Sequence, residues 1–490
     1  PRRTWSIASA LTMLGALTIL LAQRSLLTDA YSAVALNDPL SFYARLVLLL
    51  AGLILLGLAH DQVDDARAAE FFGALLMIHA GSMLIAASNE LVFLFVGLEL
   101  VSIPTYLILY LPRRNVTTLE AATTYFYLSI FSSALFLYGM AYLYGLTGVS
   151  NLKALSYLIH ESHIRYIPQA QFGLIAAVFL MAGLGFRVAA VPFHFYAPDV
   201  YQGSPTVVAA LMSWVPKAIG FVAILRCLTA VLGGDNPVAQ HAITLCWVIA
   251  VVSMVLGNTV ALIQEDLKRL LAYSSISHAG YLMIGVTVAF ANGPNITAAY
   301  LGGQGILFYL TAYSLMTLGA FGVIIALDTP ERPVRTVSDL AGLGRTNPLM
   351  AFAMALCLFS LAGVPPMAGF FGKFTIFASA LTASTGENGS MFLLLALIGV
   401  ITAAIGAYYY LRIVVKMYLW PADGPAPICR AAWPTLTAVG VCAVFSLVFG
   451  LYPSPIDVAA REATIASVAQ PDPAIAPTRR IASTAPVSAR

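Results

Sequence analysis

The sequence predicts an all-α polytopic membrane protein, and its composition and its hydropathy pattern are the observations that predict it. Of the 490 residues, 60% are hydrophobic and only 10% are charged, and the mean hydropathy is +0.86. Uncharged runs of about 20 residues recur along the chain, which is the length that a helix needs to cross a hydrocarbon core of roughly 30 Å. In lipid only helices and closed barrels satisfy every backbone polar group, and these runs lack the alternating pattern of barrel strands.

Thirteen apolar spans are predicted, each of them helical. They lie at about 5–23, 39–60, 68–87, 90–111, 119–146, 171–191, 207–231, 240–263, 269–290, 299–327, 347–380, 390–418 and 432–452. Residues 470–490 are rich in Pro, Ala, Ser and Arg, so we expect a flexible tail there. Because the sequence opens with Pro-Arg-Arg and no methionine, we also expect that a piece precedes it.

The loops fall into two sets of very different charge when successive spans are placed alternately across a membrane. One set collects the residues Arg2, Arg3, Arg67, Arg113, Arg114, Lys268, Arg269, Arg332, Arg335, Arg345 and Arg430. Before the tail, the other set holds only Arg24, Lys153 and Arg165. By the positive-inside rule the first set is predicted to be cytoplasmic.

One apolar span is interrupted in the stretch 183–206, GLGFRVAAVPFHFYAPDVYQGSPT. It contains three prolines and the charged or titratable residues Arg187, His194 and Asp199. Broken helices survive at membrane depth only where they are buried in protein or line a wet cavity. A charge at that depth is a functional-site hypothesis. The alternative is that Arg187 reaches a nearby membrane surface and that the prolines mark a simple loop.

A second interrupted stretch, 361–374 (LAGVPPMAGFFGKF), has two adjacent prolines, three glycines and then Lys373. The two interrupted spans hold the same place in two five-helix units, 68–232 and 240–420. A unit with an odd number of helices that is repeated directly must be inverted in the membrane, and matching broken helices in inverted repeats indicate a transport site. The other predicted parts are N-terminal helices at 1–67, a C-terminal helix and chain end at 430–469, and the tail at 470–490.

Two charged residues lie deep in apolar spans. Glu99 is about ten residues into the span 90–111, and Lys217 is about ten residues into 207–231, which places it roughly 15 Å from either end. A lysine side chain does not reach water over that distance, so Lys217 must pair, lose its proton or meet internal water. The alternative is a structural ion pair between helices.

Several other polar residues are weaker candidates for the functional site. Lys373 lies nearer a helix end, where reaching the membrane surface is a fair alternative. His278 lies about nine residues into its span and is a relay candidate, whereas the equally deep His79 is assigned to the core, because a lone histidine is usually a satisfied core residue. Four further basic residues lie close to span ends and are therefore predicted to be ordinary anchors, namely Arg45, Arg226, Arg412 and Lys416.

The deep charges together indicate a proton path. An acid, an arginine and two lysines on separate helices, beside two broken helices, can make and break charge pairs, and such pairing changes proton affinity. A sodium site would need several clustered oxygens. The spans contain one deep carboxylate, Glu99, so the pattern favours a proton path over a sodium site.

The same composition argues against other classes of function. The formal net charge of +3 suggests no nucleic-acid partner, and the five cysteines form no C-x-x-C pair, so neither zinc nor an iron–sulfur cluster is indicated. The sequence has no phosphate-binding Gly-rich loop and no dinucleotide fingerprint. We therefore expect no redox cofactor in this chain.

Five motifs, taken together and in order, resemble the antiporter-like N subunits of bacterial respiratory complex I, NADH:quinone oxidoreductase. The resemblance covers nearly the whole chain except the tail. It implies fourteen helices with two inverted five-helix repeats, of which this chain would lack the first helix. The motifs are VGLELVSIPTYL (96–107), GLGFRVAAVPFHFYAPDVYQGSP (183–205), GNTVALIQEDLKRLLAYSSISHAGYL (257–282), SLAGVPPMAGFFGKF (360–374) and AYYYLR (407–412).

The resemblance also implies a set of proton-path residues. By motif they are Glu99, Arg187, Lys217 and Lys373, with His194 and His278 as relay candidates. The family has a lysine where this chain has Arg187, and arginine does not deprotonate in proteins. We therefore expect Arg187 to be a fixed positive charge within roughly 4–6 Å of the Glu99 carboxylate.

The resemblance implies partners and a location as well. NADH, flavin, iron–sulfur clusters and quinone would belong to partner subunits. This chain would contact the sister antiporter-like subunit M and the small subunits K, J and A, in the bacterial inner membrane.

Two alternative functions stay open. One is a scaffold that keeps the fold without pumping, in which Glu99 and Arg187 form a permanent ion pair. The other is a free-standing cation/proton antiporter. The presence of Lys217 and Lys373 favours proton translocation over the scaffold.

Overall fold

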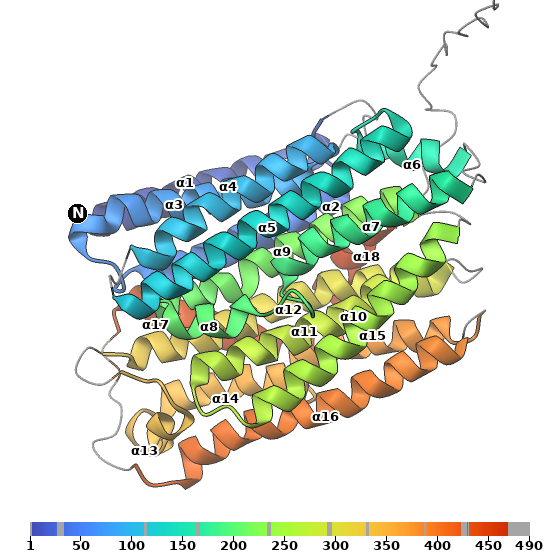
Figure 1. Ribbon diagram of the computed structural model, residues 1–490. Coiled ribbons are helices and arrows are strands. Elements are labelled where there is room, and N and C mark those ends of the chain that lie inside the picture. Colours follow the sequence, from blue (N-terminus) through green and yellow to red (C-terminus); the bar gives the residue numbers. More distant parts are fainter. Residues whose placement is uncertain are drawn as a thin grey trace, which may run out of the picture.

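The computed structural model describes residues 2–26, 34–111, 115–161, 167–232, 237–291, 296–329, 333–386, 389–422, 429 and 431–468, and it is built from helices. Among these residues the only β-type pairings are isolated bridges, so the predicted all-α class is confirmed. In Figure 1 the long helices lie side by side, with α1, α3, α4 and α5 at one edge of the molecule and α16 at the other. The α-helices are α1 (Arg2–Ala22), α2 (Pro39–Ala59), α3 (Ala68–Ala87), α4 (Leu91–Tyr110), α5 (Val116–Thr147), α6 (Leu152–Glu161), α7 (Ile167–Val188), α8 (Tyr196–Gly203), α9 (Thr206–Leu232), α10 (Pro237–Leu262), α11 (Leu267–Ala289), α12 (Ile296–Leu327), α13 (Leu343–Thr346), α14 (Pro348–Ala362), α15 (Ala368–Ala383), α16 (Gly389–Leu419), α17 (Trp433–Leu451) and α18 (Ser454–Val468).

Local sequence signals set several helix ends. Asp38 caps α2 by accepting a hydrogen bond from the backbone N–H of Ser41 at 2.7 Å, and Pro39 occupies the first helical position, where a missing N–H costs nothing. Asn115 and Thr118 form a capping box at the start of α5. The same helix ends at Gly148, whose φ of 68° is the left-handed conformation that glycine adopts without strain.

Ten helices among the described residues are long and apolar enough to cross a membrane. Three shorter apolar helices, Phe172–Val188, Pro348–Ala362 and Ala368–Ala383, belong to the two interrupted spans. The predicted span 269–290 corresponds to α11, which contains several serines and a histidine and is buried along almost its whole length. It tolerates polar residues because it is enclosed by protein rather than by lipid.

The centre of the molecule consists of α9, α11 and α12. The apolar window of α9 is entirely buried, and that of α12 is 94% buried. Close approach between α11 and α12 depends on glycine, because a Cβ added at Gly285 would lie 2.9 Å from the carbonyl oxygen of Gly302. Side chains on these three helices therefore face other helices, which is the environment in which membrane-embedded polar groups find partners.

The two interrupted helices share one backbone geometry. Each first limb, α7 or α14, is followed by a residue with positive φ, Ala189 at 55° or Gly363 at 85°. The next residue donates its N–H to the carbonyl five residues earlier, at 2.9 Å in the first break and 3.0 Å in the second. A cis peptide bond follows in each, Val191–Pro192 and Pro365–Pro366. This match is what equivalent positions in two repeats would produce, while the boundaries of the repeats stay a prediction.

The C-terminal part has a further helix that the sequence analysis did not predict. The expected last span, 432–452, is α17, and α18 follows after Tyr452 and Pro453. A Cβ added at Gly450 would lie 1.8 Å from the carbonyl oxygen of Pro366, so α17 ends against the break between α14 and α15. The sequence analysis did not predict α18 because its hydropathy is low and only apolar spans were considered.

The loops gather at two ends in the way that the alternating spans predict. At one end the backbone N–H of Arg2 donates to Asp65 at 3.0 Å, and the backbone N–H of Ala432 donates to Asp61 at 2.8 Å. The start of α1, the loop before α3 and the start of α17 therefore lie together. Which end is cytoplasmic stays a prediction. The predicted tail 470–490 and the basic residues Arg113, Arg114, Arg165, Arg332 and Arg430 lie outside the described residues.

Candidate functional site

Glu99 and Arg187 lie close together, and three serines bind the Arg187 guanidinium. The Arg187 guanidinium lies at the end of α7, and its Nη2 is 3.6 Å from Oε1 of Glu99 on α4, as expected from the sequence. Its Nη1 donates hydrogen bonds to Oγ of Ser102 and, at 3.4 Å, to Oγ of Ser129. Its Nη2 donates to Oγ of Ser133 at 3.2 Å, and that hydroxyl donates to Glu99. The guanidinium is therefore held by α4 and α5 from two sides.

Arg187 is buried, whereas Glu99 is not fully enclosed. The side chain of Arg187 is 1% exposed and that of Glu99 is 26% exposed. Arg187 does not reach a membrane surface, so the snorkelling alternative is wrong. It lies in the last turn of α7, where the partial negative charge of the helix end favours a cation.

Water is expected beside this cluster. Three buried polar atoms here have no hydrogen-bond partner within the described chain, namely Nε of Arg187 and the hydroxyls of Tyr106 and Tyr125. The two tyrosine rings lie 5.6 Å apart between α4 and α5. Buried polar groups without a protein partner are normally satisfied by ordered water.

Lys217 is buried in the middle of α9, and its partners are not charged. Its Nζ donates to both the backbone carbonyl and the hydroxyl of Ser275 on α11. It also lies 5.1 Å from the ring centroid of Tyr313 on α12, within the range of a cation–π contact. Lys217 forms no salt bridge with any described residue, so the structural ion-pair alternative does not apply to it.

His278 on α11 uses both ring nitrogens. Nε2 lies 2.9 Å from the hydroxyl of Tyr410, and Nδ1 is hydrogen-bonded to the hydroxyl of Tyr309. Which nitrogen carries the proton depends on the tautomer. The ring centroid of Tyr313 lies 5.1 Å from that of His278. Tyr313 therefore contacts both His278 and Lys217 and joins them.

Lys373 on α15 is bound to the second break. Its Nζ donates to the last carbonyls of α14, at 2.8 Å to Leu361 and 3.1 Å to Ala362, which would otherwise lack intrahelical donors. The residue is 5% exposed, so it does not reach the membrane surface. Its Nζ is 5.1 Å from the ring centroid of Tyr281, which is 5.7 Å from that of His278. A continuous series thus runs from Lys217 across α12, α11 and α15 to Lys373.

The other two histidines singled out in the sequence, His194 and His79, are less connected. His194 lies between α7 and α8, and its Nδ1 is buried without a partner in the described part of the chain. No contact joins it to Arg187 or Lys217 among the described side chains. His79 is hydrogen-bonded to the carbonyl of Leu75 in its own helix at 2.9 Å and packs against Gly52, as a core residue does.

Sequence reasoning missed a buried ion pair. Arg226, predicted to be an ordinary anchor, donates to both oxygens of Asp38 at 2.8 and 3.2 Å and to the carbonyl of Ala86. Both charged side chains are less than a tenth exposed. The prediction for Arg226 is therefore wrong, because a residue near a span end can still be enclosed by neighbouring helices. The other predicted anchors do bond near helix ends, namely Arg45, Arg412 and Lys416.

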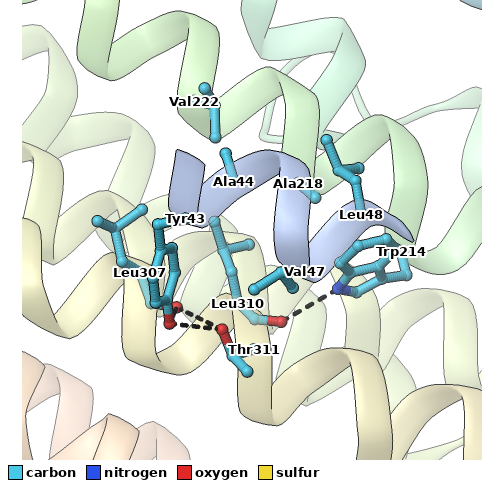
Figure 2. A pocket seen from close by; sticks show the side chains of 10 residues that line it. All are labelled: Tyr43, Ala44, Val47, Leu48, Trp214, Ala218, Val222, Leu307, Leu310 and Thr311. Atoms are coloured by element: carbon cyan, nitrogen blue, oxygen red, sulfur yellow. Dashed lines mark hydrogen bonds between the residues drawn. The ribbon is translucent and has the colours of Figure 1, made fainter. Parts of the chain in front are cut away.

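A small cavity between α2, α9 and α12 lies next to this site but is not part of it (Figure 2). The hydroxyls of Tyr43 and Thr311 on its wall are bonded to each other at 2.7 Å, and Nε1 of Trp214 donates to the carbonyl of Leu310 at 3.1 Å. The rest of the lining is apolar. Since these polar side chains are already paired, the cavity offers little to a polar ligand.

The described residues do not include a group of three or more His, Cys, Asp or Glu side chains that could hold a metal ion. The five cysteines are free. Four of them, Cys227, Cys246, Cys357 and Cys442, are buried among apolar side chains. The side chains that the site brings together are lysine, arginine, histidine, tyrosine, serine and glutamate, and each of them can form hydrogen bonds with its neighbours.

Known proteins resemble the chain over most of its length. Residues 88–406 match the family model described as "NADH:quinone oxidoreductase/Mrp antiporter, TM". The NADH-quinone oxidoreductase subunit N of Trichlorobacter lovleyi is 42% identical over 373 residues, which cover 76% of this chain and 72% of that protein. A chain in the structure of respiratory complex I from Thermus thermophilus with bound Aureothin is 33% identical, with a TM-score of 0.76 and 94% of both chains covered.

A more distant structure shares the fold alone. A chain of the Mrp complex from Dietzia sp. is 20% identical with a TM-score of 0.81, and the match covers 95% of this chain and 93% of that one. The family model, the close relative and the complex I structure agree with each other and with the motifs at both helix breaks. The chain therefore belongs to the NADH:quinone oxidoreductase/Mrp antiporter family, as an antiporter-like membrane subunit of the subunit N type.

Proposed function

We propose that this subunit carries protons across the membrane for a respiratory NADH:quinone oxidoreductase without performing redox chemistry itself. The observation that carries the proposal is the series Lys217, Tyr313, His278, Tyr281 and Lys373, which links four buried helices and ends at a helix break. Each lysine has neutral hydrogen-bond partners rather than a carboxylate. An ammonium group taken out of water without a counter-charge must be compensated or lose its proton, so both lysines are suited to exchange protons.

Arg187 has a different role in this mechanism. Its guanidinium keeps its proton, so it acts as a fixed positive charge that holds the Glu99 carboxylate in place. Protons then pass through Lys217, His278 and Lys373, with His194 as an additional relay candidate beside the first break. The hydroxyls of Tyr309 and Tyr410 on both sides of His278 can donate or accept, which lets the ring change tautomer.

The rest of the complex supplies the driving reaction. We propose that NADH, flavin, iron–sulfur clusters and quinone are held by partner subunits and that this chain itself holds no cofactor. The proposed neighbours are the sister subunit M and the small subunits K, J and A in a bacterial inner membrane. Redox-linked changes in those neighbours would drive the change of protonation along the lysine series.

A non-pumping scaffold is the second candidate function, and the Arg187 geometry favours it. Three serines and Glu99 surround the guanidinium, which is how a permanent structural ion pair would be built. The lysine series argues against it, because a scaffold has no need of two buried cations with neutral partners.

Lys217→Ala decides between the two candidates. In the proton-carrying mechanism the assembled complex should pump fewer protons per electron pair, because the deepest exchangeable group is lost. Protons and quinone reduction are measured together in proteoliposomes. Lys416→Ala is the matched control, since Lys416 is a partly exposed lysine near the end of α16 that is bonded to Ser338 at 2.9 Å. An unchanged proton yield in an assembled Lys217→Ala complex would favour the scaffold.

A further inference from the structure

Among the described side chains, Ser133 is hydrogen-bonded to both members of the Glu99–Arg187 pair. Nη2 of Arg187 donates to its Oγ at 3.2 Å, and its hydroxyl donates to Oε1 of Glu99. The direct separation of 3.6 Å between Nη2 and Oε1 is too long for a hydrogen bond. The two charges are therefore joined through one hydroxyl, which α5 inserts between α4 and α7.

The other two serines of the cluster bind only the Arg187 member of the pair. Ser102 and Ser129 accept hydrogen bonds from Nη1 of Arg187, and their hydroxyls form no described bond to Glu99. They hold the guanidinium from the side that faces away from the carboxylate. Ser129 precedes Ser133 by one helical turn on α5, so it is a matched comparison on the same helix.

The hydroxyl of Ser133 can respond to the charge of Glu99. A serine hydroxyl has one hydrogen to donate and two acceptor positions. While Glu99 is a carboxylate, Ser133 donates to it and accepts from Arg187. When Glu99 takes up one proton it gains a donor O–H and keeps an acceptor oxygen, so the Ser133 hydroxyl can either go on donating to that oxygen or turn to accept from the new O–H. Arg187 keeps all its protons in both states, so the only net change is the proton on Glu99.

We propose that Ser133 is a positioning residue that holds the Glu99 carboxylate in line with the fixed charge of Arg187 and lets it gain and lose a proton without moving that charge. The partial exposure of Glu99 provides the side from which the proton arrives. The consequence for pumping rests on the proposed proton-carrying function, whereas the contact itself does not.

The test compares Ser133→Thr with Ser133→Val in the intact complex, because these side chains have the same shape and differ in the hydroxyl. Ser133 is only partly buried, which leaves room for the added methyl group. Infrared difference spectroscopy measures the carboxyl band of Glu99, which is assigned as the band that Glu99→Gln removes. We expect Ser133→Val to shift this band and to slow proton-coupled turnover roughly tenfold, the size of effect expected when a hydrogen bond to a charged group is lost. Ser133→Thr should restore both, and Ser129→Ala should leave the band in place.

Each outcome has a separate meaning. If Ser133→Val and Ser129→Ala behave alike, or if Ser133→Val leaves the Glu99 band unshifted, the inference is overturned whatever Lys217→Ala does. If the band shifts and threonine restores it while Lys217→Ala pumps normally, Ser133 still positions Glu99 and it is the proton-carrying function that fails.

Discussion

The cations of the candidate site are bonded mainly to neutral groups, unlike Arg226, which is paired with the carboxylate of Asp38. Lys217 and Lys373 donate to a serine and to helix-end carbonyls, and Arg187 donates mainly to serine hydroxyls. Neutral partners stabilise a buried cation without fixing its charge as strongly as a carboxylate would. At the residue scale, the proposed mechanism therefore has the lysines change protonation state while the arginine keeps its charge.

Substitution of Arg187 tests this distinction. Arg187→Lys keeps the positive charge but makes the group able to exchange a proton, so coupled proton transport should be maintained or improved. Arg187→Ala should reduce it, because Glu99 would lose its fixed counter-charge. Proton yield per electron pair in proteoliposomes is the measurement. Normal pumping by an assembled Arg187→Ala complex would show that Arg187 has only a structural role.

At the scale of helices, a few close contacts determine how the elements pack. The bidentate pair between Arg226 and Asp38, with the carbonyl of Ala86 as a further acceptor, ties α9 to the start of α2 and the end of α3. The contact between Gly450 and Pro366 sets α17 against the second break. Both contacts join segments that are far apart in the sequence.

Removing one partner of the buried ion pair should destabilise the subunit strongly. Arg226→Ala leaves the Asp38 carboxylate buried and uncompensated, which costs about 3–5 kcal/mol. We expect a lower midpoint of thermal unfolding in detergent. The double variant Arg226→Met with Asp38→Asn removes both charges and should recover much of the loss. If the single variant is as stable as the parent protein, the pair contributes no structural stability.

Two glycines on α17 provide a matched test of packing against the break. A Cβ at Gly450 would overlap the carbonyl of Pro366, whereas a Cβ at Gly440 would meet no atom within 4 Å. Gly450→Ala should therefore cost about 1–3 kcal/mol of stability through overpacking. Gly440→Ala should be neutral or stabilising, because alanine favours a helix over glycine by about 1 kcal/mol. Equal melting temperatures for the two variants would show that α17 does not pack tightly at the break.

At the scale of the whole molecule, the lysine series runs through buried side chains, since Lys217, Tyr313, His278 and Lys373 are each no more than 5% exposed. Apolar side chains on the outer helices, such as Ile130 and Phe131 on α5 and Val400 and Ile401 on α16, face outward. This arrangement suits a lipid or subunit environment on the outside and proton exchange within.

The orientation of the molecule in the membrane is predicted from the basic loops. Arg345 and Arg24 are exposed and belong to the two opposite loop sets. In a background where the partly accessible Cys429 is replaced by serine, Arg24→Cys should react with a membrane-impermeant thiol reagent added outside the cells. Arg345→Cys should react only after the cells are opened. The reverse labelling pattern would show that the predicted orientation in the membrane is wrong.

The sequence by itself determined the class of the fold, the places of its membrane helices and the two interruptions, because each depends on local hydropathy and on the rule that backbone groups in lipid must be bonded. It also located the deep residues Glu99 and Lys217 by counting along each span. Only the tertiary structure decided their partners, such as Ser275 for Lys217 and Ser133 between Glu99 and Arg187. Those partners come from other helices, and which helices touch follows from side-chain packing across the whole molecule. The helix α18 escaped detection for a related reason. Its buried face consists of small residues such as Ala460 and Ala463, and contact with neighbouring helices rather than apolar length holds it in place.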